Sequence, residues 1–135
     1  MAVVEELIRA GEGSISFGNY TLGEKAKKED FEHQGAVYKV KTFSTMTKLE
    51  KNGNFAYESV PGTSVVDFKE SEKGISFKVE GNEDAQLTLG LEPECEYLVK
   101  IDGRESGRVK ANLGGKLSIS VELDPGREVL VEVEK

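Results

Sequence analysis

Strict alternation of apolar and polar side chains near the C-terminus is the feature that most constrains the fold of this chain. Apolar Leu117, Ile119, Val121 and Leu123 alternate with polar Lys116, Ser118, Ser120 and Glu122. Only an extended strand places every second side chain on one face, so a helix could not bury these apolar residues together. The segment therefore predicts a β-strand with one buried face and one face in water.

The same period recurs through the second half of the chain and predicts seven short strands. We expect them around residues 65–68, 75–79, 87–91, 97–101, 109–111, 117–123 and 129–133. Between them lie Asp102-Gly103, Gly114-Gly115 and Asp124-Pro125-Gly126, which have the composition of tight turns. Seven short strands separated by turn signals are typical of an antiparallel β-sandwich.

The first half predicts β-hairpins with two irregular segments. Residues 36–43 alternate as a strand, and Asn52-Gly53 is a strong hairpin signal. Residues 3–10 place their apolar side chains on one helical face and predict a short helical turn. Residues 24–32 are highly charged, and we interpret them as a loop or a helical turn.

The sharpest break in the chain is the turn sequence Val60-Pro61-Gly62-Thr63. It divides an N-terminal β-hairpin region, 1–60, which carries the helical turn, from a β-sandwich module, 61–135. The hairpins either extend the sheets of the sandwich or form a small subdomain. We favour one cooperative domain over residues 1–135.

Charge and cysteine content exclude several classes of partner and scaffold. The 25 acidic and 18 basic residues give a net charge of −7. The densest basic stretch, Lys25 to Lys28, is followed at once by Glu29 and Asp30, so no basic patch exists for nucleic acid or an anionic membrane. Cys95 is the only cysteine, which excludes an intrachain disulfide scaffold.

The sequence also predicts a location. No stretch approaches 18 apolar residues, and the first residues lack the basic start and long apolar core of a signal peptide. We expect a cytoplasmic protein, or a secreted one if a signal was removed ahead of residue 1.

No catalytic, metal or cofactor motif is present. His33 is the only histidine and lies in a polar stretch that predicts a surface position. Glu94 and Glu96 flank Cys95, and neighbouring anions make a thiol less nucleophilic. The acidic loops do not have the spacing of a calcium-binding EF-hand. We therefore predict no catalytic residue, no metal site and no cofactor.

The tyrosines of the first half are the candidate binding residues. Tyr20, Tyr38 and Tyr57 lie on predicted strands or beside turns. A tyrosine hydroxyl needs a polar partner or water, so we expect Tyr38 and Tyr57 at the rim of a surface. All three rings could contact a ligand such as a glycan. Phe55 is expected in the core.

Residues 91–101 read Leu-Glu-Pro-Glu-Cys-Glu-Tyr-Leu-Val-Lys-Ile. This segment resembles the tyrosine corner of fibronectin type III and immunoglobulin-like sandwiches, which implies that the Tyr97 hydroxyl bonds to backbone upstream. The chain departs from that pattern because it has no tryptophan and because three strands follow the tyrosine strand. Residues 97–133 are also similar to small β-sandwich modules at the C-termini of bacterial polysaccharide-active enzymes, where the module is an accessory.

These features lead to three functional hypotheses. The first is a non-enzymatic interaction module that binds a protein partner or itself through its sheet edges. The second, from the C-terminal resemblance, is a carbohydrate-binding accessory domain. The third is a hydrolase or lyase that uses a carboxylate pair across a cleft.

Overall fold

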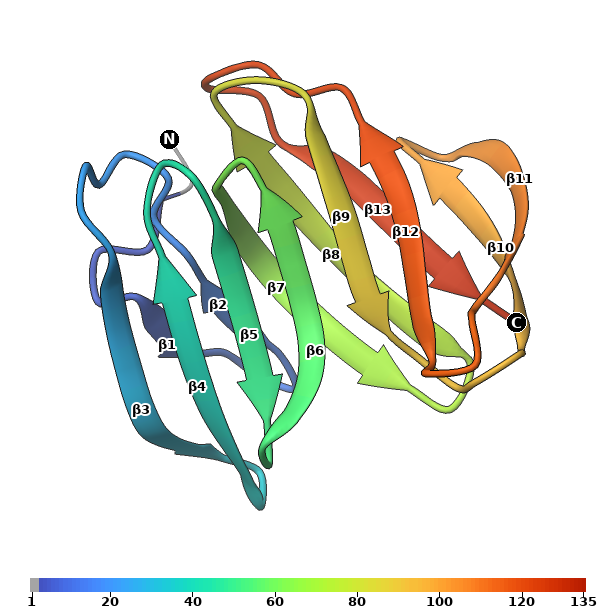
Figure 1. Cartoon of the computed structure of the whole chain (residues 1–135), viewed down its shortest axis with the longest axis horizontal. Helices are drawn as coiled ribbons and strands as arrows, with labels where there is room; N and C mark the ends of the chain where they lie inside the picture. The colour runs from blue at the N-terminus through green and yellow to red at the C-terminus, as the bar shows by residue number, and fades with distance from the viewer. Residues whose placement is uncertain (1–2) are drawn as a thin grey trace.

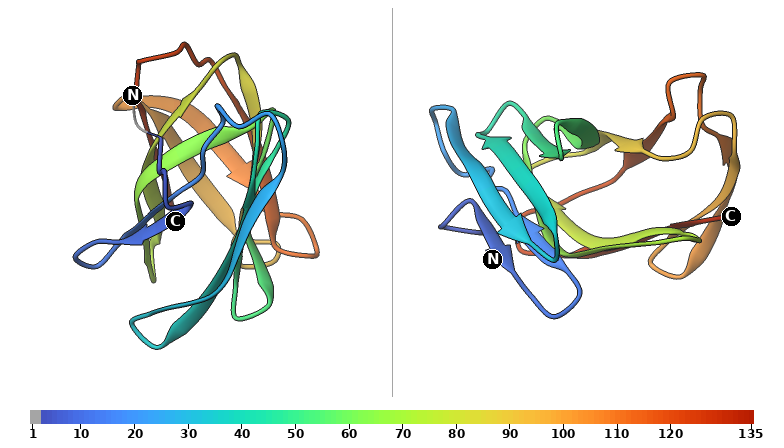
Figure 2. Two further views of the ribbon diagram at one scale, coloured as in Figure 1. Left: turned by 90° about the vertical axis from the view of Figure 1, so that its left-hand side faces the viewer. Right: turned by 90° about the horizontal axis from the view of Figure 1, so that it is seen from below.

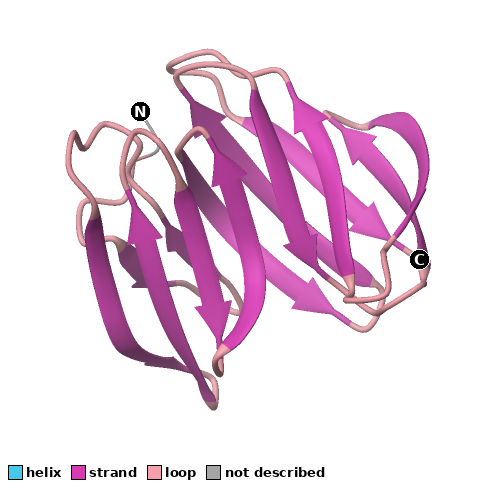
Figure 3. Cartoon of the chain, viewed as in Figure 1, coloured by secondary structure: helices cyan, strands magenta, loops and turns pink. Residues whose placement is uncertain are grey.

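The computed structural model describes residues 3–135, and these residues form thirteen β-strands and no helix (Figure 3). The strands make two antiparallel sheets that pack face to face, so the predicted mainly-β sandwich is confirmed. Residues 3–135 accordingly contain no helix long and apolar enough to cross a membrane.

The first sheet, sheet A, lies behind the second in Figure 1 and contains seven strands in the order β1-β2-β7-β8-β13-β10-β11. Their bounds are β1 Ile8–Ala10, β2 Ile15–Phe17, β7 Thr63–Ser71, β8 Gly74–Gly81, β10 Glu96–Ile101, β11 Arg104–Lys110 and β13 Val129–Glu134.

The second sheet, sheet B, contains six strands in the order β12-β9-β6-β5-β4-β3. Their bounds are β3 Ala26–His33, β4 Ala36–Thr42, β5 Thr47–Lys51, β6 Asn54–Val60, β9 Ala85–Gly90 and β12 Lys116–Val121. The two layers are seen edge-on in the right-hand view of Figure 2.

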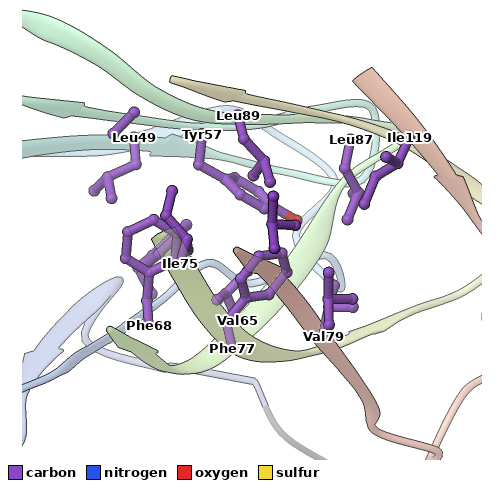
Figure 4. Packing of buried hydrophobic residues seen from close by; sticks show 14 of the residues in the cluster. Leu49, Tyr57, Val65, Phe68, Ile75, Phe77, Val79, Leu87, Leu89 and Ile119 are labelled. Atoms are coloured by element: carbon purple, nitrogen blue, oxygen red, sulfur yellow. The ribbon is translucent and has the colours of Figure 1, made fainter. Parts of the chain in front are cut away.

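The core lies between the sheets and follows the alternation in the sequence. In β12, Leu117, Ile119 and Val121 are buried while the residues between them are exposed. Phe68 and Phe77 of sheet A lie beside Tyr57 of sheet B (Figure 4). The ring centroids of Phe17 and Phe77 lie 5.3 Å and 5.6 Å from that of Tyr57, both in edge-on geometry. Such pairs stabilise a core beyond the area they bury.

Two predictions for the first half are wrong. The segment predicted as a helical turn forms a β-turn, closed by the Leu7 N–H bond to the Val4 carbonyl, and then strand β1. An isolated helix this short is marginal, whereas pairing with β2 satisfies the β1 backbone. The charged stretch 24–32 contains most of strand β3, which pairs with β4. Its charges fit a strand at the edge of a sheet.

Strands from both halves of the chain lie in both sheets. In sheet A, β2 pairs with β7, and in sheet B, β6 pairs with β9. The N-terminal strands therefore extend the two sheets across the sequence break at residues 60–63. That the chain unfolds as one cooperative unit stays a prediction.

Candidate interaction edge

The three candidate tyrosines do not form an exposed aromatic face. The exposed fractions of Tyr20, Tyr38 and Tyr57 are 1%, 7% and 0%. Tyr57 points into the core from β6 (Figure 4), where burial raises the pKa of its hydroxyl. The rim position expected for Tyr57 is wrong, because its hydroxyl bonds to the Thr63 hydroxyl inside the protein instead of water.

Tyr20 bonds to Glu80, whose side chain points to the outer face of sheet A because its neighbour Val79 on β8 points into the core. The Tyr20 hydroxyl donates a hydrogen bond to the carboxylate of Glu80, whose side chain is also buried. Burial, followed by the bond to Glu80, raises the pKa of the Tyr20 hydroxyl. A buried carboxylate with a phenol donor is a structural pair, and it leaves no ring surface for a ligand.

Tyr38 and His33 line a small polar hollow where the two sheets open at one end. Lys51 of sheet B and Glu70 of sheet A form an ion pair of 3.3 Å at this hollow. His33 is partly buried, with its Nε2 atom inside the protein and unbonded, so the expected surface position is only partly met. The opposite charges of Lys51 and Glu70 already neutralise each other, and the hollow offers no net charge to a ligand.

Phe55, expected in the core, lies partly buried on the outer face of sheet B. The ammonium groups of Lys116 and Lys48 lie 4.7 Å and 6.0 Å from its ring centroid. Gly90 of β9 lies between Lys116 and Phe55 in the sheet and has no side chain to block their contact. A Cβ atom at Gly90 would lie 2.2 Å from the Phe55 carbonyl oxygen, so only glycine fits at this position.

Tyr97 has the geometry of a tyrosine corner. Its hydroxyl oxygen accepts a hydrogen bond from the backbone N–H of Glu92 at 3.1 Å, and its side chain is buried. Residues 91–95 carry the chain from β9 in sheet B to β10 in sheet A. The hydroxyl therefore ties the start of β10 to the segment that crosses between the sheets.

We expect Tyr97→Phe to lower the free energy of unfolding by about 1 kcal/mol, because it removes one hydrogen bond and leaves the ring in place. Urea unfolding followed by circular dichroism measures the change. An unaltered free energy of unfolding would mean that this hydroxyl contributes nothing to the corner.

The sandwich has four edge strands, and three of them carry features that oppose pairing with another chain. Strand β1 has three residues. Strand β3 has consecutive charges and a bulge between Lys28 and Phe31. Strand β11 is charged, contains Gly107 at φ 108° and pairs with β10 through a bulge. Short, charged or bulged edges are the usual protection against edge-to-edge association.

Strand β12 is the fourth edge and has none of these features. It pairs with β9 in one unbroken register from Lys116 to Val121. No charge, proline or glycine lies between Lys116 and Glu122. Ser118 and Ser120 are exposed and lie on the outer face of sheet B. The edge is therefore regular in its pairing and uncharged along its centre, and its two serines are exposed to water.

The backbone of β12 presents free hydrogen-bonding groups at this edge. The Lys116 N–H donates to Asn112 Oδ1 at 2.9 Å, and the Lys116 carbonyl accepts from the Asn112 N–H at 3.0 Å. Lys116 thus points its backbone groups away from β9, and Ser118 and Ser120 point theirs the same way because the direction alternates along an antiparallel strand. Neither serine finds a backbone partner on that side among residues 3–135.

An exposed apolar residue lies beside the same edge. Leu113, in the loop that leads into β12, is 80% exposed, more than Val37 or Val60, the other large apolar residues exposed in the described chain. The sequence patterns predict binding at sheet edges in general and do not single out β12. The sequence feature that could have identified β12 is its uncharged alternating segment between Lys116 and Glu122.

The described residues show no group of three or more histidine, cysteine or acidic side chains that could hold a metal ion. Glu132 and Glu134, the acids beside the hollow at Gly74, lie on one strand and do not face each other across a cleft. Comparison with protein-family models, curated proteins and solved structures finds no match for this chain.

Proposed function

We propose that this protein is a non-enzymatic interaction module that binds an extended strand of a partner protein along β12. The observation that carries the proposal is the contrast between three protected edges and one regular, uncharged edge. In strand addition, backbone hydrogen bonds supply affinity and alternate side chains supply specificity. Ser118 and Ser120 supply the backbone donors and acceptors.

The side chains around the edge favour a partner strand of matching pattern. Leu117, Ile119 and Val121 lie on the buried face, so a partner strand would continue the apolar layer with every second residue. On the outer face, the Ser118 and Ser120 hydroxyls bond to Thr88 and Gln86, at 3.3 Å and 2.7 Å. These bonds hold both serines against β9 and leave the edge unobstructed.

Ser118→Pro tests this proposal directly. Proline removes the N–H that points away from β9, and an edge strand tolerates it because no bond to β9 is lost. We expect extended peptides selected on the native protein from a displayed library to lose at least tenfold in affinity for this variant, because the central backbone donor is gone. Isothermal titration calorimetry measures the loss.

Two controls match this variant. Ser118→Thr keeps the N–H and should keep the peptide affinity. Arg108→Pro places proline at an outward-facing position of the edge strand β11. The Ala111 N–H, three residues further on, bonds inward to the Cys95 carbonyl at 2.9 Å, and the direction alternates from residue to residue, so the Arg108 N–H points outward. This variant should also keep the affinity. Selected peptides that bind native protein and Ser118→Pro equally would refute strand addition at β12.

A carbohydrate-binding accessory role is the second candidate, and Phe55 is the observation that favours it. This ring lies partly exposed among polar side chains on the outer face of sheet B, unlike the buried tyrosines. The Tyr97 hydrogen bond likewise supports the proposed kinship with fibronectin type III and immunoglobulin-like sandwiches. A glycan array on native protein and Phe55→Ala tests the sugar role, which requires binding that the variant loses.

A further inference from the structure

The sequence of β12 is complementary to itself, and this property points to a particular partner. Resting on the strand addition proposed above, we propose that β12 pairs with β12 of a second copy of this chain, antiparallel and centred on Ile119. The two six-stranded sheets would then join into one continuous sheet across a two-fold axis.

The register follows from the residue types. From Lys116 to Glu122 the strand and its next residue read Lys-Leu-Ser-Ile-Ser-Val-Glu. Antiparallel pairing about Ile119 sets each serine opposite a serine, Leu117 opposite Val121, and Lys116 opposite Glu122 of the other copy. Opposite charges directly across a strand pair stabilise it, and the two-fold axis creates this pair twice.

The directions in which the backbone groups of β12 point agree with this register. Ser118 and Ser120 both point their N–H and carbonyl groups outward, so each would exchange two bonds with its counterpart, giving about four backbone hydrogen bonds in all. The outward groups of Lys116 are already bonded to Asn112, so the new backbone bonds are limited to the centre of the strand, and Glu122 of the other copy would meet Lys116 through the ends of the two long side chains. Centring the pair on Ser118 instead would set Lys116 opposite Ser120 and leave both charges without partners.

The surroundings of the strand fit a second copy as well. Beyond Glu122 the antiparallel copy would run past the loop that holds the 80% exposed Leu113. Glu122 is exposed and forms no ion pair with another residue in the described part of the chain, so its charge is available to the Lys116 of the second copy.

Two features make the expected dimer weak. An interface of one strand length is smaller than that of a stable complex, so association should depend on concentration. Lys116 also interacts with the Phe55 ring in the unpaired chain, at 4.7 Å, so the new charge pair competes with an existing contact. The variant Glu122→Lys therefore tests the register without altering the contact between Lys116 and Phe55.

Charge exchange at the two positions tests the proposal. Lys116→Glu sets two like charges opposite each other at both ends of the pair, and so does Glu122→Lys. We expect the dimer Kd from sedimentation velocity over a dilution series to rise about tenfold in each variant. When the two variants are mixed, position 116 of each faces an opposite charge at position 122 of the other, so the mixture should associate as tightly as the native protein.

The control is Lys110→Glu on β11. Lys110 is exposed, and this variant changes the net charge by the same amount as Lys116→Glu. It should leave the native Kd unchanged. Circular dichroism checks that each variant is folded.

Two results would overturn this inference and leave the proposed function standing. A native protein that sediments as a monomer at every concentration would show that β12 does not take a second copy, while peptide binding would still test strand addition. A dimer that Ser118→Pro abolishes, but that neither charge variant weakens, would place association at β12 in another register. A dimer that survives Ser118→Pro, together with selected peptides that ignore it, would refute both proposals.

Discussion

Thr63→Val should lower the free energy of unfolding by about 3 kcal/mol, although valine has nearly the same shape as threonine. The Thr63 hydroxyl bonds to the Tyr57 hydroxyl and to the Ser59 hydroxyl, each at 2.8 Å, and all three side chains are buried. Valine would leave two buried hydroxyls without this partner. The penalty for such groups exceeds the net value of the bonds themselves.

The hydrogen bonds that Thr63→Val removes are bonds between the two sheets. Thr63 belongs to β7 of sheet A, whereas Tyr57 and Ser59 belong to β6 of sheet B. Thr47 of sheet B also donates its hydroxyl proton to the Thr63 carbonyl at 2.8 Å. Thr42 extends the network by a 2.8 Å bond to Thr47.

Thr88→Val is the matched control, because Thr88 lies on the outer face of β9 with a single side-chain bond of 3.3 Å to Ser118. It should change the free energy of unfolding by less than about 0.5 kcal/mol. Equal losses in the two variants would show that the buried network has no special weight. The same urea curves test the domain prediction, since a single cooperative domain gives one transition with an unchanged slope.

The sequence predicts the fold class well because alternation is a local signal. Each strand of the second half appears near its expected position, and the turn residues lie between strands, as at Asp102-Gly103. The strands of the first half are harder to predict from the sequence because they depend on pairing with strands elsewhere in the fold. Residues 26–33 become a strand only because β4 offers an edge, and a highly charged segment gives no apolar period from which to predict this.

The candidate site shows the same limit. The alternation that identifies β12 as a strand does not say whether it lies in the middle or at the edge of a sheet, and a serine pair fits both. That β12 has β9 on one side and water on the other follows from the strand order, which single-sequence patterns do not determine. The burial of Tyr20 is hard to predict for a related reason, because its partner Glu80 lies sixty positions away in sequence.

At high pH the protein should lose stability steeply, beginning above about pH 10. Burial, the largest cause, raises the pKa of Tyr20 and of Tyr57 in the folded state. Below the ordinary tyrosine pKa both states keep the protons and the effect is absent. Above it, the unfolded chain releases protons that the folded chain retains, so rising pH favours unfolding by about 1.4 kcal/mol per pH unit for each tyrosine.

Urea unfolding at a series of alkaline pH values measures this slope. Tyr20 and Tyr57 together should contribute about 3 kcal/mol per pH unit to it, and Tyr38 and Tyr97, whose pKa values burial also raises, add to it. Tyr57→Phe should reduce the slope by about 1.4 kcal/mol per pH unit, because one proton fewer is released on unfolding. The lysines are the same in both proteins, so the difference isolates Tyr57. Phenolate absorbance provides the second measurement, because these hydroxyls should ionise only as the protein unfolds. Phenolates that all appear near pH 10 in a protein that stays folded would mean that the two side chains are open to solvent.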